Sequence, residues 1–80
     1  MKIPRMVGFC PFCGQGLINI VKDTATLVLH LSCDECETEW AEPNKLEEED
    51  CLPYNTYRRH EFPTDKEIVD AGWSKFIITP

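Results

Sequence analysis

The sequence contains no long apolar run. Its longest apolar clusters are Leu27-Val28-Leu29 and Phe76-Ile77-Ile78, whereas a membrane-spanning helix needs roughly 18 such residues. The segment Met1–Arg5 also has no apolar stretch of the length found in signal peptides. We therefore expect a soluble, cytoplasmic protein, in a reducing compartment where clustered cysteines are more often metal ligands than disulfides.

Catalytic motifs are also absent from the sequence. It contains no Ser/His/Asp set, phosphate-binding loop or His-Glu zinc motif. The two histidines, His30 and His60, have no obvious catalytic companion, although either is chemically able to replace a metal ligand. Cys51 lies beside an acidic run that disfavours its thiolate. We therefore interpret it as a residue without a chemical role or as a core thiol, and not as a nucleophile. We expect no enzymatic activity.

Positive charge is scarce. Eight Lys and Arg residues face fourteen Asp and Glu residues, for a net charge of −6. Between Asp34 and Asp50 lie nine acids and one base, a net of −8. The only basic cluster is Arg58-Arg59-His60, whereas nucleic-acid-binding domains usually carry a basic stripe. The charge pattern therefore favours a basic protein partner over a phosphate backbone.

Four of the five cysteines form two C-x-x-C pairs, Cys10/Cys13 and Cys33/Cys36, with nineteen residues between them. This is the ligand spacing of a tetrahedral zinc site. A chain of 80 residues is also short enough to need such a staple, because a domain of this size buries only about 60% of its unfolded surface. Four thiolates leave no open position for a reactive water, so the zinc is predicted to be structural.

Iron is the competing metal. The run Cys10-Pro11-Phe12-Cys13-Gly14 resembles one knuckle of rubredoxin. The second knuckle, with Asp34, Glu35 and Glu37, lacks the proline and glycine expected there. This departure favours zinc over an electron-transfer iron centre.

Hydrophobic patterning predicts an α+β fold. The expected strands lie over residues 17–22, 26–32, 37–41 and 73–79, and the expected helices over 45–51 and 64–72. Each helix has a candidate capping box, Asn44 with Glu47 and Thr64 with Glu67. We expect one domain over residues 1–80, with the knuckles and hairpin in 8–41 and an extension with helices and a C-terminal strand in 42–80.

The first half of the chain, from the Cys10 knuckle to Trp40, resembles the zinc-ribbon superfamily. That resemblance implies a three-stranded antiparallel sheet that carries a structural Zn²⁺ on Cys10, Cys13, Cys33 and Cys36. The whole chain also resembles, in size, acidity and layout, the small bacterial immunity proteins of polymorphic or contact-dependent inhibition systems. That second resemblance implies that the protein neutralises a cognate toxin domain, often a basic nuclease.

The predicted partner surface combines acids with an aromatic anchor. Its members are Trp40, Glu47, Glu48, Glu49 and Asp50. Acids beside an aromatic patch that the metal holds rigid suit a basic protein surface. The alternative is a zinc-ribbon accessory factor that contacts nucleic acid or the transcription or translation machinery, for which Tyr54 and Tyr57 beside the arginines offer base stacking.

Overall fold

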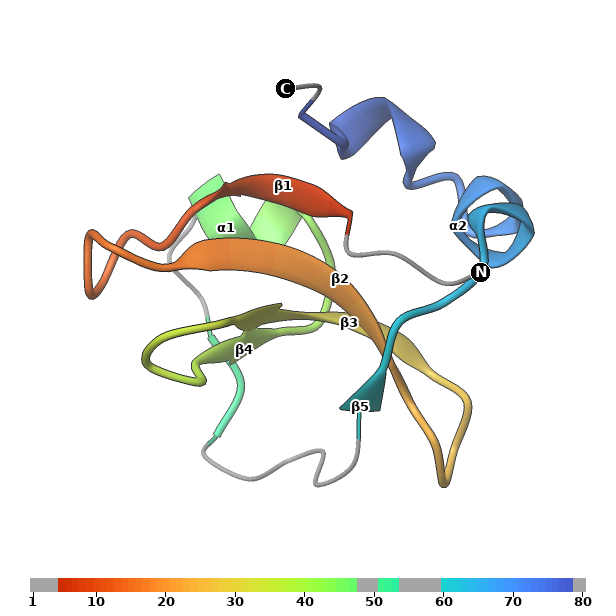
Figure 1. The fold of residues 1–80 in the computed structure, drawn as a ribbon, viewed down its shortest axis with the longest axis horizontal. Coiled ribbons are helices and arrows are strands. Elements are labelled where there is room, and N and C mark those ends of the chain that lie inside the picture. Colours follow the sequence, from red (N-terminus) through yellow and green to blue (C-terminus); the bar gives the residue numbers. More distant parts are fainter. Residues whose placement is uncertain (1–4, 48–50, 54–59, 79–80) are drawn as a thin grey trace.

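The computed structural model describes residues 5–47, 51–53 and 60–78. Within these residues, one antiparallel sheet has the strand order β1-β2-β3-β4, and β5 pairs with β2 (Figure 1). The strands are Met6–Phe9 (β1), Leu17–Asp23 (β2), Leu29–Cys33 (β3), Glu39–Trp40 (β4) and His60–Glu61 (β5). Two short α-helices, Asn44–Glu47 (α1) and Asp65–Asp70 (α2), and a 3-10 turn, Ser74–Phe76 (η1), complete the described structure. An antiparallel sheet with two short helices confirms the expected α+β fold class.

The central strand is β2, and its two edges are used differently. Along one edge, β3 pairs with Ile18–Lys22. Along the other edge, β1 pairs near Leu17 and β5 pairs at Lys22 and Asp23. The sequence analysis recognised neither β1 nor β5, because both are short and gain their strand character from pairing with β2.

The turn between β2 and β3 is longer than expected. Asp23 Oδ2 accepts hydrogen bonds from the backbone N–H and the hydroxyl of Thr26, each at 2.8 Å, and Leu27 takes a positive φ of 65°. Residues 26–28 therefore belong to the turn, and the strand predicted over 26–32 begins at Leu29. The third strand shortens in the same way, to Glu39–Trp40.

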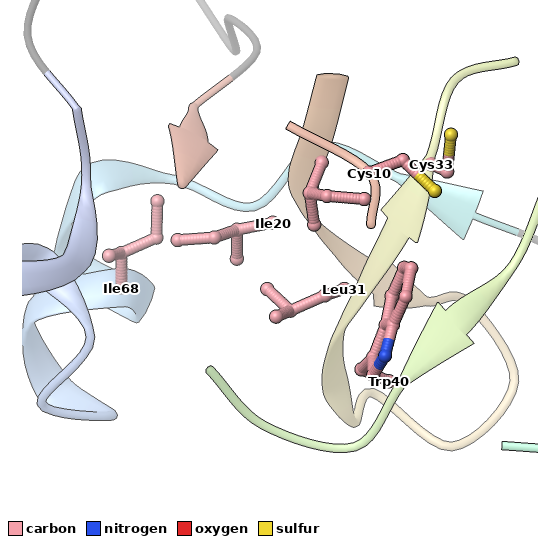
Figure 2. Packing of buried hydrophobic residues seen from close by; sticks show 7 residues of the cluster. Cys10, Ile20, Leu31, Cys33, Trp40 and Ile68 are labelled. Carbon is pink, nitrogen blue, oxygen red and sulfur yellow. The ribbon is translucent and has the colours of Figure 1, made fainter. Parts of the chain in front are cut away.

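The hydrophobic core lies on one face of the sheet. Figure 2 shows its members extending from Ile68 of α2, through Ile20 and Leu31, to Trp40 and the thiols of Cys10 and Cys33. Ile20, Leu31 and Trp40 are each 0% exposed. The alternation in β2 and β3 explains this, because every second residue of a strand points to the same face.

The capping box of α2 is confirmed. The Glu67 N–H donates to Thr64 Oγ1 at 3.2 Å, and the Thr64 N–H donates to Glu67 Oε1 at 2.8 Å. The helix ends before Gly72, whose φ of 77° suits a residue without a Cβ atom. The first expected helix begins at Asn44 itself, while the Glu47 side chain and residues 48–50 lie outside the described residues.

The C-terminal strand predicted over 73–79 is wrong. The N–H groups of Phe76 and Ile77 donate to the carbonyls of Trp73 and Ser74, which closes a 3-10 turn and withdraws these groups from strand pairing. The Ile78 N–H donates to the Met6 carbonyl of β1 at 2.8 Å. Across the described residues, no helix has the length and apolar character needed to cross a membrane.

Candidate metal centre

The first cysteine knuckle follows β1 directly. Cys10 comes immediately after the strand, its N–H donates to the Gly16 carbonyl at 2.9 Å, and its carbonyl accepts the Gly14 N–H at 3.1 Å. Gly14 has a φ of 69°, which is the left-handed turn expected of the glycine after the second cysteine. These bonds turn Cys10 and Cys13 toward the same point.

The second knuckle connects β3 to β4. Cys33 is the last residue of β3, and its N–H donates to the Thr38 carbonyl at 2.9 Å. Glu37 follows the second cysteine here, as Gly14 does in the first knuckle, and it has a similar φ of 62°. Both knuckles therefore make the same turn, although only the first has the glycine that makes it easy.

The four thiols meet as the spacing predicts. Sγ of Cys10 lies 3.6 Å from Sγ of Cys36, and Sγ of Cys13 lies 3.7 Å from Sγ of Cys33. These separations are too long for disulfides, which span about 2.05 Å. Four sulfurs placed tetrahedrally at 2.3 Å around one ion lie about 3.8 Å apart. The four residues, hereafter the thiol cluster, can hold a metal ion.

Hydrogen-bond donors surround the thiol cluster. Backbone N–H groups reach Cys10 Sγ from Cys13 at 3.5 Å, Cys13 Sγ from Gly16 at 3.3 Å, and Cys33 Sγ from Glu35 at 3.4 Å. Such donors stabilise thiolates, which are the form of cysteine that binds metal. The hydroxyl of Thr38 lies 3.1 Å from Cys36 Sγ and adds a side-chain partner.

The four thiols differ in acidity. Backbone N–H groups of Gln15 and Gly16 lower the pKa of Cys13 to about 6. Burial raises the pKa of Cys33 to about 12 and also raises the pKa of Cys10. The Thr38 hydroxyl lowers the pKa of Cys36. Burial therefore makes Cys10 and Cys33 the thiols that hold their protons most strongly in the absence of metal.

Gly16 is a part of the centre that the sequence analysis missed. A Cβ atom at this position would clash with Cys33 Sγ and crowd Asp34 Oδ1 at 3.1 Å. The sequence feature that indicates this role is a second glycine after Cys13, three residues along the chain, in addition to Gly14. Gly16 lets the two knuckles approach each other closely enough for their sulfurs to meet.

The prediction that Trp40 offers an aromatic ring to a partner is wrong. Trp40 is 0% exposed and lies in the core, so it cannot offer its ring to a partner. Phe12 of the first knuckle stacks on it, with ring centroids 5.9 Å apart and planes 9° from parallel, and remains 50% exposed. Trp40 pairs with Leu31 and lies on the core face of the sheet, and that direction is what buries it.

The acidic segment is divided by the fold. Asp34, Glu35, Glu37 and Glu42 are exposed around and after the second knuckle, whereas Glu39 is buried in β4. Three of the predicted partner residues, Glu48, Glu49 and Asp50, lie outside the described residues, as does the side chain of Glu47. Cys51 is exposed, so it is not a core thiol, and it lines a hollow beside Cys36.

A second cluster, not predicted from the sequence, lies on the other face of the sheet. His30, Glu39 and His60, hereafter the histidine cluster, bring ligand-type atoms close enough to hold a metal ion. Burial lowers the pKa of His30 to about 4, so its ring is neutral near pH 7. The cluster was not predicted because its residues come from three strands, and β5, which carries His60, was not among the predicted strands.

Comparison of the chain with protein-family models, curated proteins and solved structures finds no match. The function is therefore inferred from the geometry of the two clusters and from the exposed residues around them.

Proposed function

We propose that the thiol cluster binds a structural zinc ion and that the protein acts by binding a basic protein partner, as an immunity protein that neutralises a bacterial toxin domain. Sulfur separations of 3.6 and 3.7 Å support the tetrahedral tetrathiolate site. Four thiolates complete the coordination of zinc, so the ion supplies stability to the fold and offers no position for catalysis. A colourless protein with one zinc per thiol cluster would separate zinc from iron.

The observation that supports a binding role is the surface beside the centre. Phe12 is 50% exposed on the first knuckle, and the acids Glu35 and Glu37 are exposed on the second. The sulfur contacts between Cys10 and Cys36 and between Cys13 and Cys33 place these two knuckles against each other. An exposed aromatic ring on one knuckle and exposed acids on the other suit a basic protein surface, because the ring supplies contact area and the acids steer the encounter.

The proposed immunity role also specifies the class of partner, a toxin domain. A net charge of −6 on 80 residues complements a basic toxin such as a nuclease. Such an inhibitor needs no chemistry of its own, only a rigid surface of the right charge, and the knuckles supply that surface. The resemblance in size and layout to small immunity proteins supports the same role.

The first experiment identifies the partner class. We expect a nuclease-treated pull-down from the native cell to recover a basic protein encoded beside this chain, and co-expression of the two to relieve the growth defect that the partner causes alone. Recovery of nucleic acid or of ribosomal or polymerase subunits, without a toxic neighbour, would contradict the immunity role and favour the accessory-factor alternative.

The second experiment tests the surface with a charge-matched pair. Glu35→Lys reverses an exposed acid on the second knuckle, and Asp70→Lys reverses one on α2 with the same change in net charge. We expect Glu35→Lys to weaken the complex about tenfold, equivalent to about 1.4 kcal/mol, and to reduce its salt dependence, while Asp70→Lys has a much smaller effect. Equal effects of the two variants would show that net charge alone, and not this surface, drives binding.

A further inference from the structure

The histidine cluster is assembled by strand register on the face of the sheet opposite the core. His30 pairs with Val21, Glu39 pairs with Ser32, and His60 pairs with Asp23. Residues opposite each other in an antiparallel pair share a face, and so do alternate residues of one strand. The three side chains therefore come from β3, β4 and β5 onto one face, while Ile20, Leu31 and Trp40 occupy the other.

The polar atoms of the cluster are closely spaced. Glu39 Oε2 lies 3.3 Å from His30 Nε2 and 3.3 Å from His60 Nε2. His60 Nδ1 lies 3.0 Å from His30 Nε2. Nitrogen and oxygen ligands placed tetrahedrally at 2.0–2.1 Å around zinc lie about 3.3 Å apart. His60 can offer only one of its two nitrogens to an ion, and with either nitrogen two of the three ligand pairs have about this spacing. One ligand atom from each residue lies within 4.8 Å of the other two.

Burial and tautomer also suit a metal site. The side chains of His30 and Glu39 are 0% and 5% exposed, and His60, at 33%, closes the cluster toward solvent. His30 Nδ1 lies 3.4 Å from the Val28 carbonyl, which can only accept a hydrogen bond. A proton on Nδ1 leaves the lone pair on Nε2, directed into the cluster. Metal-ligating histidines commonly hold their second nitrogen against a backbone carbonyl in this way.

We propose that His30, Glu39 and His60 form a second zinc site, with His30 Nε2, Glu39 Oε2 and one ring nitrogen of His60 as ligands. Two imidazoles and one carboxylate are the donor set of zinc sites that keep a fourth, open position. A hollow of about 200 Å³, lined by Asn19, Val21, Ser32 and His60 among others, lies on the same face and gives space beside His60 for a water or a small ligand.

A metal ion at this site would anchor the C-terminal part of the chain to the sheet. Within the described residues, β5 has two residues, and these pair with β2 at Lys22 and Asp23. A metal ion held by His60 from β5, together with His30 and Glu39 from β3 and β4, ties this short strand across the sheet. The alternative is a purely hydrogen-bonded network, in which the ring nitrogens of His60 bridge His30 and Glu39 without metal.

The test counts metal on the full chain. We expect the zinc-loaded protein, after removal of loosely bound ions, to carry two zinc ions per chain in native mass spectrometry. His60→Ala should lose one of them and keep the other, because His60 contributes nothing to the thiol cluster. Glu61→Gln, a change at the neighbouring position of β5 that is not a proposed ligand, should keep both.

Cobalt substitution assigns each ion to its cluster. Co²⁺ at the thiol cluster gives intense sulfur-to-metal charge-transfer absorption, and this signal should be unchanged in His60→Ala while the second cobalt is lost. A wild-type chain that binds one zinc at saturation would overturn the proposal and assign the cluster to the hydrogen-bonded network. Two zinc ions retained in His60→Ala would also overturn it, as would a second equivalent taken up only as iron.

Discussion

The thiol cluster and the histidine cluster are built in opposite ways from the same sheet. Each pair of thiols comes from a local turn, in which the second cysteine follows the first by three residues, and the hairpin of β2 and β3 brings the two turns together. The histidine cluster has no local unit, because its three residues come from three strands. A local motif announces its chemistry in the sequence, whereas a cluster made by register appears only after the strands have paired.

The two clusters should also differ in what they contribute to folding. The thiol cluster includes two core residues, Cys10 and Cys33, that pack with Trp40 and Leu31. Loss of its metal would leave buried thiols where ligands were. The histidine cluster lies outside the core and holds a two-residue strand, so its loss should loosen β5 and leave the rest of the sheet paired.

The largest expected effect is the removal of metal from the thiol cluster. Structural zinc binds with about 10–16 kcal/mol, which equals or exceeds the stability of about 5–15 kcal/mol of a typical domain. Chelation, or Cys33→Ser, should therefore abolish the cooperative thermal transition followed by circular dichroism. Cys51→Ser, at the exposed fifth cysteine, is the matched control and should melt like the wild type. A cooperative transition in the chelated protein would contradict a structural role for the metal.

The second-largest effect is expected for a substitution at Gly16, which tests how closely the two knuckles must approach each other. Gly16→Ala places a Cβ atom against Cys33 Sγ and should destabilise the fold by about 1–3 kcal/mol, with weaker zinc binding. Gln15→Ala changes an exposed neighbour and should stay within about 0.5 kcal/mol of the wild type. Competition with a chromophoric chelator measures the metal affinity, and chemical denaturation measures the stability. Equal behaviour of the two variants would show that the knuckles tolerate the extra carbon.

The smallest effect concerns the ion pairs by which Lys22 of β2 holds α2 and β5. Lys22 Nζ lies 2.7 Å from Glu67 and 3.1 Å from Glu61, and together with the Thr64 N–H it lowers the pKa of Glu67 from 4.5 to about 2. A carboxyl with a lowered pKa in the folded state stabilises it above the ordinary pKa, and this contribution is lost as the pH falls from about 4.5 toward 2.

Glu67→Gln removes this titration and keeps an oxygen for the capping box. We expect a melting temperature slightly below that of the wild type at pH 7 and a shallower loss of stability below pH 4.5, so that the two curves converge in acid. Protonation of the thiol cluster destabilises both proteins equally, so the difference between the curves isolates Glu67. Parallel curves would show that the ion pair with Lys22 contributes nothing measurable.

Much of the fold was predictable because it depends on local patterns. Hydrophobic patterning over residues 17–22 and 26–32 identified the hairpin of β2 and β3, and the Thr64–Glu67 box identified the start of α2. The C-terminal strand was wrong because β-branched residues favour strands on average, while here 3-10 hydrogen bonds took the N–H groups that pairing needs. The partner surface was partly wrong because Trp40 occupies the core and Phe12 takes its exposed place.

The sequence by itself determined the thiol cluster, since two knuckles with fixed spacing need only one hairpin to bring them together. Only the tertiary structure decided the rest of the chemistry. It placed Gly16 against Cys33, buried Trp40 beneath Phe12, and brought His30, Glu39 and His60 onto one face. The physical reason is register: side chains on different strands meet only when their backbones pair at one particular offset, and no spacing along the chain records that offset.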